Sequence, residues 1–94
     1  MGVAFIIVYH ELVLREDIHR LSSVDRARVK QAIEEKLTSE PEAFGKPLRR
    51  SLKGYKKLRV GDYRVIFRIE QQTIKVFCIG HRSMVYHKVD KRIC

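Results

Sequence analysis

Hydrophobic positions in the first half of the chain predict a strand followed by two helices. Residues 3–9 (VAFIIVY) are mostly β-branched, aromatic or aliphatic, which predicts a strand buried on both faces. Apolar residues then recur at helical spacing over about residues 11–21 and again to about Thr38. Ser22 or Ser23 is expected to cap the second helix, and the two helices are expected to pack as an antiparallel pair.

In the second half, the hydrophobic period changes to two, which is typical of strands. Pro41 and the Gly45-Lys46-Pro47 stretch predict the end of helical structure and the beginning of a loop. Strands are expected at about 55–60, 63–70 and 73–79, with two-residue turns at 61–62 and 71–72, an end at Gly80, and a short helix at about 83–92. The predicted fold is a single α+β domain over residues 1–94, in the order β-α-α-β-β-β with a short C-terminal helix.

The two turns set a register that sorts the side chains onto two faces. In this register Arg59 lies opposite Arg64, and Arg68 lies opposite Lys75. One face is almost wholly apolar and should pack on the helices: Leu58, Val60, Tyr63, Val65, Phe67, Ile69, Ile74, Val76 and Cys78. The other face is basic with apolar residues interleaved: Tyr55, Lys57, Arg59, Arg64, Ile66, Arg68, Lys75, Phe77 and Ile79.

Like charges directly across a strand pair are destabilising, so this basic face is expected to meet an anionic partner. The charge distribution agrees. Residues 1–45 carry six Lys/Arg against eight Asp/Glu, whereas residues 46–94 carry fourteen against three, within a net charge of +9. The alternative is a solvated surface whose long side chains spread apart. A nucleic acid or an acidic protein segment is the partner that we expect.

Other features of the sequence narrow the class of protein. Cys78 and Cys94 form no metal-binding or redox motif, and Cys78 is expected to be a reduced core residue. The longest apolar run, residues 3–9, is too short to span a bilayer and lacks the features of a signal peptide. We therefore expect a cytoplasmic protein that needs no membrane, cofactor or metal.

Two stretches resemble the RelE/ParE toxin superfamily. Residues 52–69 (LKGYKKLRVGDYRVIFRI) resemble the central hairpin of that superfamily, and residues 79–86 (IGHRSMVY) resemble its C-terminal signature. The predicted order of elements is similar too. The resemblance implies a RelE-like fold and the toxin of a type II toxin–antitoxin system.

The RelE-like branch of the superfamily is the one that we favour. Its members are ribonucleases that cut mRNA at the ribosome without a metal, by attack of a ribose 2′-hydroxyl on the neighbouring phosphate. The resemblance also implies a cognate antitoxin, RelB-like or a similar small acidic protein, in addition to mRNA and the ribosome. The ParE-like branch inhibits gyrase and is not enzymatic. A catalytically silent RNA-binding module is the third possibility.

The resemblance assigns residues to RNA cleavage. Catalytic roles carry over to Lys57, Arg64, Arg82 and Tyr86. Tyr55 stands where the RelE pattern has a second lysine, which leaves the acceptor of the 2′-hydroxyl proton open between Lys57 and His81, whose imidazole can accept a proton near neutrality. RNA binding without chemistry is expected from Lys53, Tyr55, Lys56, Arg59 and Arg68.

Overall fold

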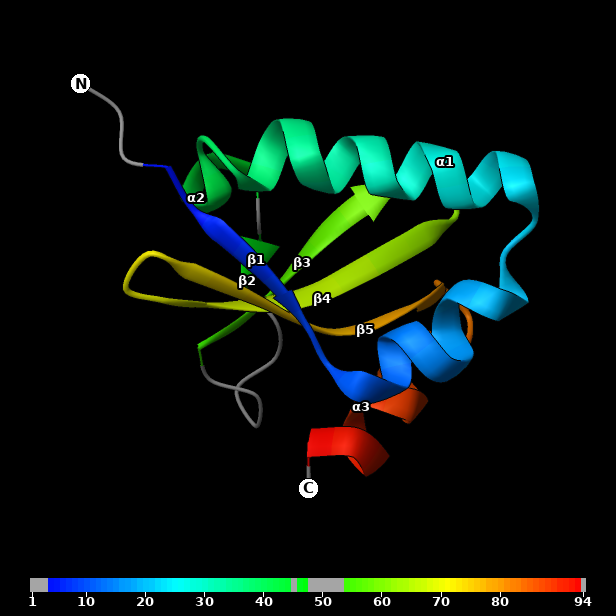
Figure 1. Cartoon of the computed structure of the whole chain (residues 1–94). Coiled ribbons are helices and arrows are strands. Elements are labelled where there is room, and N and C mark those ends of the chain that lie inside the picture. Colours follow the sequence, from blue (N-terminus) through cyan, green and yellow to red (C-terminus); the bar gives the residue numbers. More distant parts are fainter. Residues whose placement is uncertain (1–3, 45, 48–53, 94) are drawn as a thin grey trace.

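The fold is built on one mixed five-stranded sheet (Figure 1). The computed structural model describes residues 4–44, 46–47 and 54–93. The strand order is β1-β5-β4-β3-β2, in which β1 is parallel to β5 and the other pairs are antiparallel. The strands are β1 Ile6–Tyr9, β2 Lys46–Pro47, β3 Tyr55–Val60, β4 Tyr63–Glu70 and β5 Thr73–His81. The predicted α+β class and the three-stranded meander are confirmed, although β5 continues past Gly80 to His81.

The strand β1 lies at the edge of the sheet, so the prediction that it is buried on both faces is wrong. Ile7 and Tyr9 pack against the core, whereas Ile6 is 63% exposed and Val8 is 42% exposed. An edge strand pairs on one side only, and its alternate side chains point to opposite faces. Here only one of those faces is covered at β1.

Two helical segments follow β1, as the apolar spacing predicts. The first contains a π-helical turn, η1 Val13–Asp17, and a 3-10 turn, η2 Ile18–Arg20. The second consists of α1 Ser23–Ala32 and a further π-helical turn, η3 Ile33–Leu37. The Ser22 side chain caps α1, because its Oγ accepts a hydrogen bond from the backbone N–H of Asp25 at 3.1 Å.

The segment predicted as a loop contains two short elements. Pro41–Phe44 forms α2, and Lys46–Pro47 forms β2 at the far edge of the sheet. Proline is favoured at the first position of a helix because its missing N–H has no intrahelical partner there. It is also tolerated in an edge strand. Both prolines are therefore compatible with regular structure, which the loop prediction missed.

The main core lies between α1–η3 and one face of the sheet, called here the helix face. Val29, Ile33 and Leu37, spaced by four residues, are at most 3% exposed. They belong to one apolar cluster with the alternate side chains of the meander, as predicted: Leu58, Val60, Val65, Phe67, Ile74 and Val76. In Figure 1 this helix runs above the sheet, on the side opposite the C-terminal helix.

A β-bulge in β5 changes the predicted register of its second half. The pair Arg68–Lys75 and its neighbours Ile69–Ile74 and Phe67–Val76 are as expected. The register then shifts between Ile66 and Phe67, so that Ile66 lies opposite Cys78 instead of Phe77. An extra residue in one strand sends every later side chain to the other face. Ile79, predicted on the basic face, therefore joins the helix-side core, and Cys78 leaves it.

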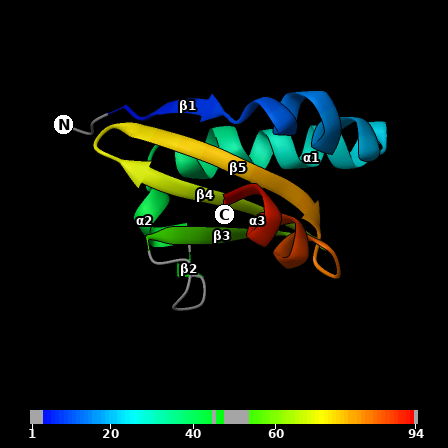
Figure 2. The same cartoon turned by 90° about the horizontal axis from the view of Figure 1, so that it is seen from below.

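The C-terminal helix α3, Val85–Ile93, covers the centre of the other face of the sheet (Figure 2). Val85 and Val89 form a second buried cluster with Ile66 and Cys78. The helix itself is as predicted, with a start two residues later. The prediction that the whole second face presents interleaved basic and apolar residues needs correction, because α3 buries its apolar centre. We use the name basic face for this side of the sheet, which carries Lys57, Arg59, Arg64, Arg68 and Lys75.

A buried carboxylate ties α3 to the first helical segment. Asp17 is 1% exposed, and its carboxylate accepts hydrogen bonds from Arg92 at 2.7 Å, from Lys88 at 3.1 Å and from the backbone N–H of Ile79 at 2.9 Å. Arg92 also donates to the carbonyl of Phe77 at 2.9 Å. Burial alone would raise the pKa of Asp17, but the bonds from Arg92 and Ile79 and the charge of Lys88 outweigh it and lower the pKa below its ordinary value of 3.8.

Two remaining expectations concern the cysteines and membranes. Cys78 is a free, fully buried thiol whose pKa rises to about 12, mainly because of burial and secondly because of the charge of Asp17. Cys94 lies outside the described residues. Within residues 4–44, 46–47 and 54–93, no helix is both long enough and apolar enough to cross a membrane.

Candidate functional site

Four cations from three neighbouring strands line one shallow pocket on the basic face. Its volume is about 220 Å³, and it is lined by Lys46, Lys57, Arg59 and Arg64. Strand pairing brings them together, because Lys46 lies opposite Lys57 across β2–β3, and Arg59 lies opposite Arg64 across β3–β4. Like charges in adjacent positions repel, so this arrangement favours an anion between them.

Tyr86 borders this pocket through α3. The Nζ atom of Lys57 lies 5.5 Å from the centroid of the Tyr86 ring, which is a cation–π distance. Tyr86 is in the first turn of α3, next to Val85, which is fully buried against the sheet. The packing of α3 thus holds Tyr86 beside Lys57.

Arg64 is held at the hairpin between β3 and β4. Its Nη1 donates to the carbonyl of Gly61 at 3.0 Å and to that of Tyr63 at 2.9 Å. Gly61 has a φ of +60°, a conformation that glycine adopts without a steric penalty, and so the turn is tight enough to bring its carbonyl within reach. These two bonds orient the guanidinium at the rim of the pocket.

Arg82 lies against the same hairpin. Its backbone N–H donates to the carbonyl of Asp62 at 2.8 Å, and its Nε is 3.9 Å from the carboxylate of Asp62. The side chain of Arg82 is 63% exposed, so that contact is weak and can be exchanged for another anion. Arg64 and Arg82 are therefore anchored to the two residues of one turn.

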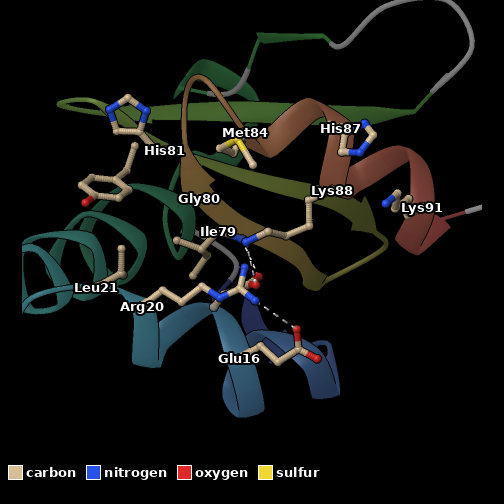
Figure 3. Close-up of a pocket in the computed structure, with 12 residues that line it drawn as sticks. Glu16, Arg20, Leu21, Ile79, Gly80, His81, Met84, His87, Lys88 and Lys91 are labelled. Carbon is tan, nitrogen blue, oxygen red and sulfur yellow. Dashed lines mark hydrogen bonds and ion pairs between the residues drawn. The ribbon is translucent and has the colours of Figure 1, made fainter.

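His81, the other candidate proton acceptor, does not line this pocket. The bulge places His81 opposite Tyr63, with the two rings edge to face at 5.7 Å. Its Nδ1 is 2.8 Å from Ser83 Oγ and accepts a hydrogen bond from the Ser83 N–H at 3.2 Å. His81 instead lines a separate cavity of about 480 Å³ between the first helical segment and α3 (Figure 3).

The residues predicted to bind RNA fall in three places. Arg59 belongs to the pocket, whereas Tyr55 and Arg68 lie opposite each other further along the basic face. Lys56 pairs with Phe67 and therefore points to the helix face, as its parity in the sequence already indicates. Lys53 lies outside the described residues.

Sequence reasoning missed Lys46 and the network around Asp17. Lys46 was predicted to lie in a loop, because a two-residue strand that contains proline gives too weak a sequence pattern to detect. Asp17 shares the four-residue spacing of Val13 and Leu21, which are both buried, and this spacing was the available signal for a buried carboxylate. In the part of the chain that the structure describes, no group of three His, Cys, Asp or Glu side chains could hold a metal ion.

Comparisons with known proteins agree with this architecture. A family model described as "ParE toxin of type II toxin-antitoxin system, parDE" matches residues 12–86. Toxin RelG of Mycobacterium tuberculosis is 36% identical over 76 residues, which cover 79% of this chain and 87% of that protein. Toxin RelE of the same organism is 33% identical over 72 residues, which cover 74% of each protein.

Solved structures of RelE toxins share the fold. The M. tuberculosis toxin–antitoxin complex RelBE2 contains a chain with a TM-score of 0.78 and 33% identity, covering 85% of this chain and 100% of that chain. An arginine-substituted variant of E. coli toxin RelE in the free state has a TM-score of 0.71 and 25% identity, covering 98% of this chain and all of that one. The chain therefore belongs to the ParE toxin family within the RelE/ParE superfamily, and it is a RelE-type toxin of a type II toxin–antitoxin system.

Proposed function

We propose that this toxin is a metal-independent endoribonuclease that cleaves mRNA at the ribosome. The observation that carries the proposal is the basic pocket of Lys46, Lys57, Arg59 and Arg64, with Tyr86 at its border. A phosphodiester is the anion that best fits four cations on an open sheet, because its oxygens can accept several hydrogen bonds at once. The toxins RelG and RelE of M. tuberculosis, which resemble this chain, support the assignment to the RelE type.

The proposed reaction needs charge stabilisation and two proton transfers. The ribose 2′-oxygen forms a bond to phosphorus while the bond to the 5′-oxygen breaks, which leaves a 2′,3′-cyclic phosphate and a 5′-hydroxyl. Arg64 would bind the phosphate oxygens, where negative charge grows in the transition state. Lys57 would accept the proton of the 2′-hydroxyl, and Arg82 would stabilise the negative charge on the leaving 5′-oxygen, which takes up a proton from water. Tyr86 would stack on a base next to the scissile phosphate.

The position of His81 argues against a direct role for it in this step. Its register partner is Tyr63 on the helix face, and its Nδ1 contacts Ser83. Lys57 instead lines the pocket itself. We therefore assign the acceptance of the 2′-hydroxyl proton to Lys57.

A ribosome assay tests the proposal. Purified toxin is added to ribosomes that are stalled with a defined codon in the A site, and the mRNA is mapped by primer extension. We expect a cut within that codon, a 2′,3′-cyclic phosphate on the upstream fragment, and loss of cleavage in Lys57→Ala. Intact mRNA at a saturating concentration of folded wild-type toxin would contradict the proposal. Salt-sensitive RNA binding without any cut would favour a silent RNA-binding module.

A second candidate function is the inhibition of gyrase. The matching family model is named for ParE, and Tyr55 stands where the RelE pattern has a lysine. A DNA supercoiling assay with purified gyrase, run beside the ribosome assay, separates the two functions. Inhibited supercoiling together with intact mRNA would replace the nuclease proposal with this one.

We also propose that a small acidic antitoxin neutralises the toxin. RelBE2 of M. tuberculosis is a toxin–antitoxin complex, and this chain has a net charge of +9 together with apolar side chains exposed on its β1 edge. Co-expression with the product of the adjacent small reading frame should yield a complex that survives size-exclusion chromatography. It should also restore the growth that toxin expression arrests. If the two proteins elute separately and growth stays arrested, that product is not the antitoxin.

A further inference from the structure

Three aromatic side chains form a row on the basic face beside α3, and one of them, Tyr55, also packs against the α3 cluster. The Phe77 ring lies edge-on to the Tyr55 ring, with centroids 5.0 Å apart at an angle of 72°. On its other side, the His10 ring is 6.2 Å away and tilted by 43°. We call Tyr55, Phe77 and His10 the aromatic row. It crosses from β3 to the residue that follows β1, and each member is half-buried.

Cations lie over this row. The Nζ atom of Lys75 is 5.1 Å from the centroid of Phe77, and the guanidinium of Arg68 is 5.5 Å from the centroid of Tyr55. Lys75 and Arg68 are also register partners across β4–β5, so two positive charges adjoin on the same patch. The Nε atom of Arg68 is 3.8 Å from the carboxylate of Glu70, and both side chains are almost half exposed. A weak surface ion pair of this kind does not neutralise the patch.

The row lies beside the bulge in β5 and toward the hairpin that joins β4 to β5. Figure 2 shows α3 over the middle of the sheet, with that hairpin and β1 outside the area it covers. Phe77 faces away from the helix face, the bulge turns Cys78 to the same side, and α3 takes only Cys78 into its buried cluster. Phe77 is therefore a half-buried ring beside charged side chains, and it belongs to neither of the two buried apolar clusters.

We propose that the aromatic row is a stacking site for consecutive bases of single-stranded RNA, with Lys75 and Arg68 binding the adjoining phosphates. The inference rests on the proposed function and extends it beyond the scissile phosphate. Tyr55 and Lys57 share a face of β3 and are two residues apart, so their Cα atoms lie about 6.8 Å apart. The row and the pocket can therefore engage one continuous strand.

Energetic comparison favours RNA over the present cation contacts. An exposed cation–π contact favours the contacting state by roughly two- to fivefold in its equilibrium constant. Stacking of a nucleobase on a protein aromatic is worth about 5- to 140-fold in affinity. A base can therefore displace Lys75 from the face of Phe77, and the released ammonium gains a phosphate partner.

Binding to an RNA that cannot be cleaved tests the inference without relying on catalysis. The probe is a fluorescent nine-nucleotide single strand with 2′-O-methyl riboses, and its dissociation constant is measured by anisotropy. Phe77→Leu keeps apolar volume and removes the ring, so we expect binding to weaken about 5- to 30-fold. Tyr63→Leu is the matched control, because Tyr63 is a half-buried aromatic of the same sheet that packs toward the helix face, and it should bind the probe like wild type.

Surface variants keep the test informative if Phe77→Leu folds poorly. Lys75→Gln should lower the slope of log affinity against log salt by about 0.7, the value for one phosphate contact with a single strand. Arg15→Gln, an exposed arginine on the first helical segment, should leave the slope unchanged. If Phe77→Leu and Lys75→Gln both bind the probe like wild type, or if a duplex of equal length binds as tightly, the inference is overturned.

The outcome is separable from that of the ribosome assay. Weakened binding in the row variants, together with intact mRNA on ribosomes, would keep the stacking site and reject the nuclease. Cleaved mRNA on ribosomes together with unchanged probe binding in the variants would keep the nuclease and reject the stacking site.

Discussion

Replacing Arg64 with alanine should lower mRNA cleavage by about 10²–10³-fold, the usual effect of removing one donor that stabilises transition-state charge. Arg64 lines the basic pocket and is held at its rim by the carbonyls of Gly61 and Tyr63. A preorganised donor of this kind contributes more than a mobile surface cation, since little reorganisation is needed when charge develops. The measurement is the rate of cleavage at saturating ribosome concentration, under single-turnover conditions.

Two controls separate this effect from loss of charge or loss of fold. Arg15→Ala removes an exposed arginine whose side chain is 69% accessible and paired with Glu11, so its cleavage rate should match wild type. Arg64→Lys keeps the charge but loses the planar, two-pronged donor, and it should recover only part of the activity. Because Arg64 bonds only one exposed turn carbonyl, that of Gly61, and one part-buried carbonyl, that of Tyr63, the thermal midpoint of Arg64→Ala should lie within a few degrees of wild type. Cleavage by Arg64→Ala within threefold of wild type would remove Arg64 from the proposed site.

The register of the central hairpin could be predicted because its turn is explicit in the sequence. Gly61-Asp62 sets the pairing of β3 with β4, and with it the opposition of Arg59 and Arg64 that defines the pocket. The pairing of β4 with β5 is also as predicted for the residues next to its turn. The turn residues and the alternation of apolar and polar side chains were sufficient to predict the register wherever the strand pairing is regular.

Prediction failed where one residue interrupted that alternation. The bulge beside Phe77 has no local signature such as a glycine, and it exchanged the faces of Cys78 and Ile79. It also places His81 opposite Tyr63, whose side chain packs toward the helix face. The face of the sheet on which His81 lies therefore depends on a register shift that no local pattern in the sequence indicates.

The contact between Asp17 and α3 shows a second limit of local patterns. The spacing of Asp17 with buried Val13 and Leu21 indicates a residue that faces the core, but its partners Lys88 and Arg92 are more than 70 positions away. The pairing of Asp17 with these two cations can be recognised only once the position of α3 in the fold is known. The ion-pair network of Asp17, which links the first helical segment to α3, was therefore found only in the structure.

Replacing Asp17 with asparagine should lower the free energy of unfolding by roughly 3–5 kcal/mol, the typical cost of removing one partner from a buried ion pair. The substitution leaves Arg92, whose side chain is 4% exposed, without its carboxylate partner. Domains of this size are stable by about 5–15 kcal/mol, so the loss is a large part of the total. Urea denaturation at neutral pH, followed by far-UV circular dichroism, measures it.

The neighbouring carboxylate provides the matched control. Glu16 is on the same helical turn, its side chain is 48% exposed, and its distance to Arg20 is 3.9 Å. Glu16→Gln should therefore change the free energy of unfolding by less than about 1 kcal/mol. Asp17→Leu also removes the acceptor for the Ile79 N–H and should cost about 1–3 kcal/mol more than Asp17→Asn. Equal stability of Asp17→Asn and wild type would mean that the network does not hold α3 in place.

Acid should erase the difference between wild type and Asp17→Asn. The pKa of Asp17 is lowered in the folded state, so its ionised form stabilises the fold fully above its ordinary value of 3.8. This contribution is lost as the pH falls below 3.8 and through the lowered pKa of the folded state. The gap in thermal midpoint between the two proteins should stay constant from about pH 7 to 5 and narrow toward about pH 2. A gap that does not narrow in acid would show that the carboxylate charge is not what binds Lys88 and Arg92.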